Sequence, residues 1–347
     1  MLSGGPATAA QRTPISVLWM TSGLGCDGDS VALTAATNPS LEDLLRGALP
    51  GIPPVILYNP MLAYETGEDF LRVFYDAAAG RLSRFIFVLE GSVPNEQING
   101  EGHWSGMGVD PVSGQPIDAC TWIDRLASRA DAVLALGTCA AYGGIPAMRN
   151  NPTGAMGLRD YLGDRWVSRA GLPIVNLPGC PVQPDNITET LLSLVLALAQ
   201  IGPAPELDDQ GRPVRLFGRT VHETCQVAGL AEQGSFADVV GDAGCLAKLG
   251  CKGPVVKCNV TVRGWINGVG GCPNVGGICM ACTMPGFPDR YMPFMRADAA
   301  ARLYARATGL SHGPVVRYLR ERRIRRTFDV EPDWRRRGPE LVSGYRR

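Results

Sequence analysis

Eleven cysteines are spread over this chain of 347 residues, and their positions constrain its fold more than any other feature. Seven of them fall between residues 216 and 295, in a segment that is rich in glycine and has no long periodic apolar run. Such a segment has too few apolar faces for a conventional core. We therefore expect it to fold around inorganic material.

The start of the chain and its longest apolar run indicate the compartment. Residues 1–14 lack the apolar stretch of a secretory signal, and Arg12 is a single arginine rather than a twin pair. The run over residues 187–201 contains Glu189 and is too short to span a bilayer. We expect a cytoplasmic protein without a transmembrane segment, and leave peripheral membrane association open. In a reduced compartment, many cysteines indicate metal rather than disulfides.

The first 201 residues alternate between apolar strands and helices, which predicts a flavodoxin-like, doubly wound α/β domain. Residues 202–215 look like a linker, and residues 202–295 are predicted to form a mostly irregular, metal-binding domain. The strands are continuous apolar runs, as buried parallel strands are. Strands are expected at 15–20, 54–59, 84–91, 131–137 and 173–178, and helices at 40–49, 66–79, 119–128 and 188–201.

Residues 296–347 are predicted to form a basic tail. From residue 301 onward the chain holds 13 arginines against five acidic residues. The stretch RYLRERRIRR indicates a solvated helical face, with a docking surface for a partner or anionic lipid as the alternative. The whole chain has a formal net charge of zero, and we expect no nucleic-acid partner.

Three cysteines follow predicted strands at their C-terminal ends, namely Cys26, Cys139 and Cys180. In an open parallel sheet these ends meet at one crevice, so we expect the three thiolates to share a site. A buried free cysteine is the alternative for any one of them. Cys120 opens a predicted helix away from the strand ends and is expected to be structural.

Asp29 is the candidate for a fourth ligand at this site. The spacing C-x-x-D from Cys26 mimics the C-x-x-C turn that lets two side chains bind one cluster. Asp29 or Ser30 could instead cap the helix that follows, and Asp27 is another candidate donor.

The cysteine-rich segment divides into two groups. The first combines the H-x-x-C pair His222 and Cys225 with Cys245 and Cys251, whereas the lone His103 and His312 are expected to be ordinary core or surface groups. The second group carries a C-x-x-C pair, and both zinc and four-iron clusters accept such ligands. Three thiolate-rich groups in one chain favour a row of redox centres over structural zinc. The second group is Cys258, Cys272, Cys279 and Cys282.

Over residues 14–295 the chain resembles the small, electron-transferring subunit of nickel–iron hydrogenases. The resemblance rests on the motifs GLGCDGD, EGSVP, GTCAAYGG, LPGCP, HETC and CMACTMPGFPD. It implies a subunit of an H2:acceptor oxidoreductase, in a heterodimer with a large subunit that holds the NiFe centre. The chain itself would hold no hydrogen-activating residue. A dimer of heterodimers stays open, and the acceptor is unknown.

The resemblance also implies three iron–sulfur clusters with positions along an electron path. Many relatives have a second proximal cysteine where this chain has Asp29, and a proline where it has Cys272. We therefore expect three 4Fe–4S clusters, the medial one completed by Cys272. The implied ligands are Cys26, Asp29, Cys139 and Cys180 for the proximal cluster, Cys258, Cys272, Cys279 and Cys282 for the medial one, and His222, Cys225, Cys245 and Cys251 for the distal one.

Further comparison with the family refines this picture. Oxygen-tolerant membrane-bound members use two extra proximal cysteines, where this chain has Gly28 and Gly144, so the chain looks most like the actinobacterial-type, high-affinity uptake branch. A cluster subunit of an acceptor- or quinone-linked complex without hydrogenase activity is the alternative. Glu90 is expected to face the large subunit or to be a strand-end surface acid. Lys248 and Lys252 are expected to compensate charge rather than to dock an acceptor.

Overall fold

The computed structural model of the chain describes residues 13–96, 104–296 and 303. Its centre is a parallel sheet of five strands in the order β2-β1-β3-β6-β7, which is the flavodoxin-like order. All five predicted strands are confirmed, because each is an apolar run buried inside the sheet. They are β1 (Ile15–Thr21), β2 (Val55–Tyr58), β3 (Phe85–Glu90), β6 (Ala132–Leu136) and β7 (Val175–Leu177).

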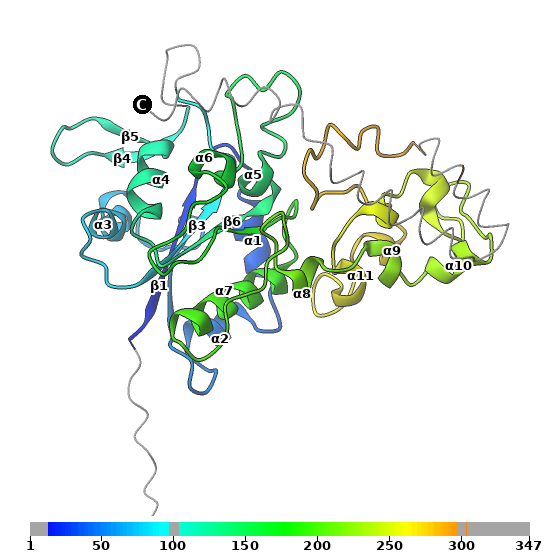
Figure 1. Ribbon diagram of the computed structural model, residues 1–347, viewed down its shortest axis with the longest axis horizontal. Helices are drawn as coiled ribbons and strands as arrows, with labels where there is room; N and C mark the ends of the chain where they lie inside the picture. The colour runs from blue at the N-terminus through cyan, green and yellow to red at the C-terminus, as the bar shows by residue number, and fades with distance from the viewer. Residues whose placement is uncertain (1–12, 97–103, 297–302, 304–347) are drawn as a thin grey trace, which may run out of the picture.

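Helices cover both faces of this sheet, as a doubly wound fold requires (Figure 1). Along β1, Leu18 and Met20 pack into the core on one face, whereas Val17 and Trp19 pack into the core on the other. The first core is closed by α3 (Gly67–Ala78), α4 (Ala119–Ala127) and α6 (Leu158–Leu162), and the second by α1 (Gly28–Leu33), α2 (Leu41–Leu45) and α7 (Pro184–Leu198).

Helix boundaries differ from the expectation mainly at α7. It begins at Pro184 rather than at residue 188, because proline suits the first turn and the Gln183 side chain accepts a 2.8 Å hydrogen bond from the amide of Asn186. Four elements of the α/β part were not predicted. They are α5 (Gly137–Tyr142), α6, and the antiparallel pair β4 (Gly106–Val109) and β5 (Pro116–Asp118).

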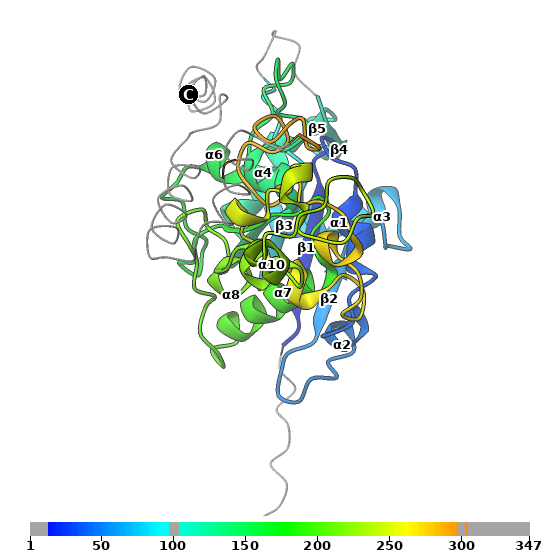
Figure 2. The same cartoon turned by 90° about the vertical axis from the view of Figure 1, so that its right-hand side faces the viewer.

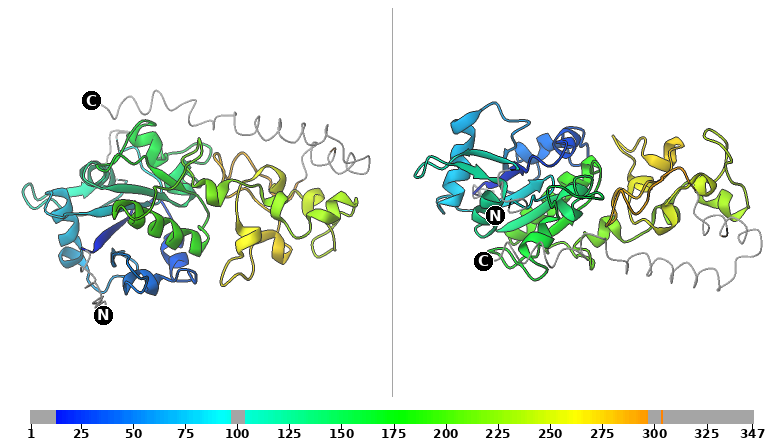
Figure 3. Two further views of the ribbon diagram at one scale, coloured as in Figure 1. Left: turned by 60° about the horizontal axis from the view of Figure 1, so that its bottom comes forward. Right: turned by 90° about the horizontal axis from the view of Figure 1, so that it is seen from above.

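The C-terminal part lies beside the α/β part along the long axis of the molecule (Figure 3). It contains only short helices joined by loops, as the lack of periodic apolar runs predicts. Small clusters of buried side chains, several of them cysteines, take the place of one large core. Its elements are α8 (Val214–Phe217), α9 (Val221–Thr224), α10 (Ala228–Glu232), α11 (Val260–Arg263) and the 3-10 turns η2 (Leu246–Leu249), η3 (Gly253–Val255) and η4 (Cys272–Val275).

The predicted linker is packed against the α/β part. Leu216 and Phe217, which directly follow it in α8, join the core that α7 helps to close, and the Arg212 side chain is completely buried. Polar contacts from α7 also reach α11, where Asn186 and Asn259 exchange hydrogen bonds of 2.9 Å. Figure 2 looks along the molecule with α10 in front of the sheet. The divisions into residues 1–201, 202–295 and 296–347 remain predictions.

Within the described residues, no helix is long and apolar enough to cross a membrane. The expected basic helical face, His103 and His312 lie outside the described residues.

Candidate metal centres

Three cysteines meet beyond the C-terminal ends of three strands. Cys26 lies between β1 and α1, Cys139 lies in the first turn of α5 after β6, and Cys180 follows β7. Burial raises the pKa of Cys139 to about 12, and the charges of Cys180, Asp29 and Cys26 add to the rise. Cys26 and Cys180 are exposed, so this proximal group (Cys26, Asp29, Cys139 and Cys180) opens at the surface of the chain.

Asp29 lies inside α1 and does not cap it, so that alternative is wrong. The N-cap residue is Asp27, and no side chain caps this helix. The Asp29 carboxylate instead accepts a 2.7 Å hydrogen bond from the amide of Val182, two residues past Cys180. Its other oxygen faces Gly137, where an added Cβ would lie only 2.0 Å away. The carboxylate therefore sits between the loops that carry Cys139 and Cys180.

The charges within the proximal group favour a bound cation. Burial, followed by the nearby charge of Glu90, raises the pKa of Asp29 to about 8 from the ordinary 3.8. The neighbouring charges that raise the pKa values of Asp29, Cys139 and Cys180 all belong to acidic groups. Iron bound among these groups would offset their repulsion and favour their ionised forms. The donor set therefore fits an iron–sulfur cluster.

Glu90 is buried inside the chain, and both expectations for it are wrong. Its side chain is 2% exposed, and its carboxylate accepts hydrogen bonds from Trp19 Nε1 at 2.9 Å, the Asp29 amide at 2.8 Å and the Ser30 hydroxyl at 2.6 Å. A carboxylate with this many internal donors is retained in the interior. Glu90 thus ties β3 to the first turn of α1 and holds the backbone of Asp29.

The two glycines noted in the sequence both lie against proximal sulfur atoms. An added Cβ would lie 3.1 Å from Cys26 Sγ at Gly28 and 2.8 Å from Cys139 Sγ at Gly144. A cysteine at either position would bring extra sulfur to this site, and this chain has none there. Cys120 is buried elsewhere and donates a 3.3 Å hydrogen bond to the Pro94 carbonyl, as expected of a structural cysteine.

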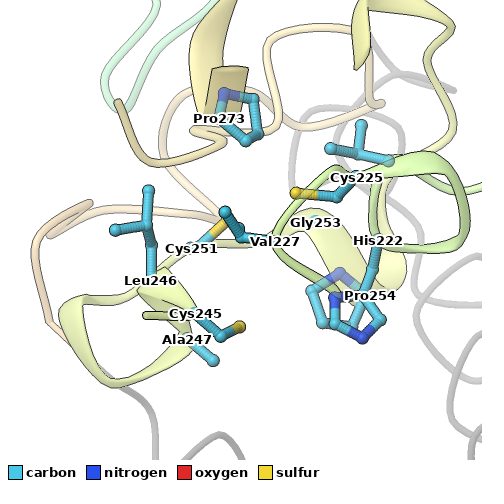
Figure 4. A pocket seen from close by; sticks show the side chains of 11 residues that line it. His222, Cys225, Val227, Cys245, Leu246, Ala247, Cys251, Gly253, Pro254 and Pro273 are labelled. Atoms are coloured by element: carbon cyan, nitrogen blue, oxygen red, sulfur yellow. The ribbon is translucent and has the colours of Figure 1, made fainter. Parts of the chain in front are cut away.

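The distal group lines a single pocket in the C-terminal part (Figure 4). His222 belongs to α9 and Cys225 ends that helix, while Cys245 and Cys251 lie on either side of η2. Burial raises the pKa values of Cys245 and Cys251, and Cys225 adds to both. Most other side chains that line the pocket are apolar. The structure therefore brings together the four predicted residues, His222, Cys225, Cys245 and Cys251.

The medial group consists of Cys258, Cys272, Cys279 and Cys282. Burial raises the pKa of Cys258 to about 11, and the charge of Cys272 adds to the rise. Burial also raises the pKa of Cys282, with Cys258 and Cys272 as the next causes. Cys272 therefore lies with the other medial cysteines, where the four-thiolate prediction needs it.

The described residues hold no three His, Cys, Asp or Glu side chains close enough to share one metal ion. The prediction concerns clusters of several irons, in which each ligand binds a different iron.

Hydrogen bonds connect neighbouring groups. The Thr138 hydroxyl donates to the Cys282 carbonyl, and because Thr138 directly precedes Cys139, this bond joins the proximal and medial groups. The Cys279 amide donates to Cys251 Sγ at 3.3 Å, which joins the medial and distal groups. The three groups are therefore arranged in series, in the order proximal, medial, distal.

Two polar residues that lie among these groups were not predicted from the sequence. Thr138 donates from its hydroxyl to the Cys282 carbonyl and accepts a 3.0 Å hydrogen bond from the Gly179 amide. Arg212 lies beside the medial group. A threonine next to a cysteine carries no signal of its own, and an arginine in a Gly/Pro-rich linker looks solvated.

Lys248 forms a 3.0 Å ion pair with Asp238 and lies 5.7 Å from the centre of the Phe236 ring. The charge-compensating role expected for Lys248 and Lys252 stays a prediction.

Comparisons with known proteins agree with this geometry. Residues 26–194 match the family of the 20 Kd subunit of NADH ubiquinone oxidoreductase, and residues 217–295 match the C-terminal family of the NiFe/NiFeSe hydrogenase small subunit. The periplasmic NiFeSe hydrogenase small subunit of Desulfomicrobium baculatum is 34% identical over 301 residues, covering 83% of this chain and 89% of that one. The Hydrogenase-2 small chain of Escherichia coli (strain K12) is 30% identical over 330 residues, covering 89% and 81%.

A solved structure is more similar still. It is an actinobacterial-type NiFe-hydrogenase from Ralstonia eutropha H16, which is 58% identical with a TM-score of 0.84 and covers 94% of this chain and 95% of that one.

A flavodoxin-like domain followed by an irregular, cysteine-rich part defines an iron–sulfur protein of the electron-transferring class. The chain belongs to the family of nickel–iron hydrogenase small subunits. It is thus the electron-transferring subunit of a hydrogenase, carries iron–sulfur clusters and pairs with a large subunit. The fold, family and function predicted from the sequence are confirmed, and nothing supports a complex without hydrogenase activity.

Proposed function

We propose that this subunit holds three 4Fe–4S clusters and relays electrons from H2 oxidation at the NiFe site of the large subunit to an external acceptor. The observation that carries the proposal is that hydrogen bonds connect consecutive groups, from the Thr138 hydroxyl to the Cys282 carbonyl and from the Cys279 amide to Cys251 Sγ. The proposed ligands are Cys26, Asp29, Cys139 and Cys180 (proximal), Cys258, Cys272, Cys279 and Cys282 (medial), and His222, Cys225, Cys245 and Cys251 (distal).

When bound, such clusters accept and pass on single electrons. The chain's own residues would set their order and environment. The Cys279 amide donates to Cys251 Sγ of the distal group, and hydrogen bonds to ligand sulfur raise a cluster's reduction potential. His222 would replace an anionic thiolate with a neutral imidazole, which favours the reduced form at the distal end.

The proximal end would face the large subunit. Cys26 and Cys180 are exposed in this chain, although cluster ligands are usually shielded from solvent. A large subunit that docks over these two side chains would cover them and bring its NiFe site to the start of the relay. We take the heterodimer as the functional unit, and native mass spectrometry would reveal a dimer of heterodimers.

The actinobacterial-type uptake branch is the proposed place of this chain within the family. The 58% identity to the Ralstonia eutropha structure supports it, as do Gly28, Asp29 and Gly144 at the proximal group.

A metal count tests the proposed clusters. The complex should be purified under anaerobic conditions with its large subunit and analysed for iron, nickel and zinc. Three four-iron clusters predict about twelve irons in this subunit beside the nickel of the large one. Zinc in place of iron, or iron for fewer than three clusters, would overturn the proposal.

Exchange of Asp29 tests the proximal ligand. A thiolate is softer and bonds iron more covalently than a carboxylate, so Asp29→Cys should change the spectrum and the potential of the proximal cluster. Asp27→Asn, two positions away, serves as the matched control and should change neither. An unaltered proximal spectrum in Asp29→Cys would remove Asp29 from the ligand set.

A further inference from the structure

Arg212 is a fully buried arginine in the segment that links the two parts of the chain. Its side chain has an exposed fraction of 0% and lies with its guanidinium carbon 5.5 Å from the centre of the Phe217 ring. Burying a guanidinium costs several kcal/mol unless it is paired and hydrogen-bonded. A loop residue with no role in the interior would remain in solvent.

The two edges of the guanidinium have different partners. Nε and Nη2 donate to one carboxylate oxygen of Asp208, at 3.0 and 2.8 Å. Nη1 is directed to the opposite side, where it lies 3.5 Å from the Thr283 carbonyl and 3.6 Å from Met284 Sδ. Thr283 and Met284 directly follow Cys282 in the chain. The ion pair therefore presents its positive end to the medial group and its negative end away from it.

We infer that Arg212 is a positioning residue of the electron relay, which holds the loop after Cys282 and places a fixed positive charge beside the medial cluster. This inference rests on the medial cluster proposed above. A positive charge stabilises the reduced state, because reduction adds a negative charge to the cluster. Arg212 thus keeps the medial potential higher than the thiolates alone would set it.

The charge of Arg212 lies close to the loops of two medial ligands. Thr283, whose carbonyl Arg212 contacts, donates a 2.9 Å hydrogen bond from its hydroxyl to the Lys257 carbonyl, directly before Cys258. Because a guanidinium stays protonated at every accessible pH, this influence is constant. An interior of low polarity screens it less than solvent would.

Potentials of the medial cluster in two opposite variants test the inference. Arg212→Met removes the positive end of the pair, and Asp208→Asn removes the negative end while keeping an acceptor of the same shape. Both would be made in the complete heterodimer and titrated potentiometrically with EPR detection. The medial signal is identified as the one that Cys272→Pro alters.

The matched control is Arg169→Met. Arg169 also pairs with a partly buried carboxylate, that of Asp131 at 2.8 Å. Asp131 directly precedes β6, so this pair lies at the N-terminal ends of the strands, whereas the proximal cysteines lie beyond their C-terminal ends. Arg212→Lys serves as a second variant, because it retains the charge if Arg212→Met fails to assemble.

We expect the reduction potential of the medial cluster to shift in opposite directions in Arg212→Met and Asp208→Asn. The medial potential should fall in Arg212→Met, rise in Asp208→Asn, change least in Arg212→Lys and remain unchanged in Arg169→Met. A merely structural role would alter stability without shifts of opposite sign. If the potential shifted in the same direction in Arg212→Met and Asp208→Asn, the inference would be overturned. Shifts no larger than that of the Arg169→Met control would overturn it as well. Absence of the medial cluster from the wild-type complex would instead contradict the proposed function.

Discussion

At the scale of single residues, the interior of this subunit depends on a few charged groups that satisfy buried donors. Glu90 is one of them, since its carboxylate accepts from Trp19, Asp29 and Ser30 in a region closed to solvent. Hydrogen bonds to a charged acceptor are worth more than neutral ones, and donors left without it cannot turn to water. The first turn of α1, which carries Asp29, therefore depends on an acid at the end of β3, 61 residues further along the chain.

Glu90→Ala should destabilise the subunit strongly. Each buried donor that loses its acceptor costs about 1–3 kcal/mol, so three of them predict a loss of at least about 3 kcal/mol. The loss would appear as a lower thermal unfolding midpoint by circular dichroism. Glu65→Ala, at an exposed loop position, is the control and should leave the midpoint unchanged. A midpoint for Glu90→Ala equal to that of the control would contradict the assigned role.

Cys272→Pro should convert the medial cluster without disturbing the backbone. Gly271 has φ 92° and ψ 138°, an extended ψ that tolerates a following proline, and Pro273 already occupies the same turn. With one thiolate removed, the oxidised protein should show a three-iron paramagnetic signal that the wild type lacks. Cys120→Ser, a change at the structural cysteine, should show none. A three-iron signal already present in the wild type would exclude Cys272 as a ligand.

At the scale of elements, α5 connects the two parts of the chain. Its second residue, Thr138, bonds the Cys282 carbonyl on one side and exchanges hydrogen bonds with Gly179 on the other. The loops of Cys139, Cys180 and Cys282 thus converge on one hydroxyl, which is 1% exposed. The distance between the proximal and medial groups is held by this short helix.

Thr138→Val should weaken this connection while keeping the shape of the side chain. One buried donor and one buried acceptor lose their partner, and at about 1–3 kcal/mol each this predicts a loss of at least about 2 kcal/mol. H2-dependent dye reduction should fall at an unchanged iron content, because the ligands of the first two groups are no longer held together. Thr138→Ser keeps the hydroxyl and should behave like the wild type. Equal effects of valine and serine would indicate that packing, not the hydrogen bond, matters.

At the scale of the whole molecule, the two parts differ in what holds them together. The α/β part has two large apolar cores on either side of its sheet. The C-terminal part has small clusters in which Cys251, Cys258, Cys279 and Cys282 are themselves packing residues. Its folding should therefore depend on the clusters that we propose for these cysteines, as in other small metal domains.

Removal of iron by a chelator should unfold the molecule in a defined order. Amide hydrogen exchange should become fast over residues 221–295, while β1, β3 and β6 stay protected, because their burial does not involve the cysteines. Hydrogen exchange followed by mass spectrometry would locate the change. Equal loss of protection in both parts would mean that the C-terminal part is not the one that the clusters stabilise.

Much of this architecture could be predicted from the sequence, because its signals are local. Continuous apolar runs identify β1, β3 and β6, and cysteines at the ends of strands predict one shared site. The first residues of helices were harder to predict from the sequence, since the beginning of α7 depends on the Gln183 side chain. The burial of polar residues was the hardest feature to predict, as Glu90 and Arg212 show. Both look like surface groups until their partners, which are distant or irregularly placed, are known.

The sequence by itself determined the class of the protein, since the number and spacing of its cysteines, with His222 and Asp29, predict three groups of candidate ligands and carry a family resemblance. Only the tertiary structure decided how those groups connect. The contacts from Thr138 to Cys282 and from Cys279 to Cys251, and the burial of Glu90 and Arg212, join segments that are far apart in the chain or unordered on their own. Their energies arise from exclusion of solvent and from precise donor positions, and both exist only after the chain has folded.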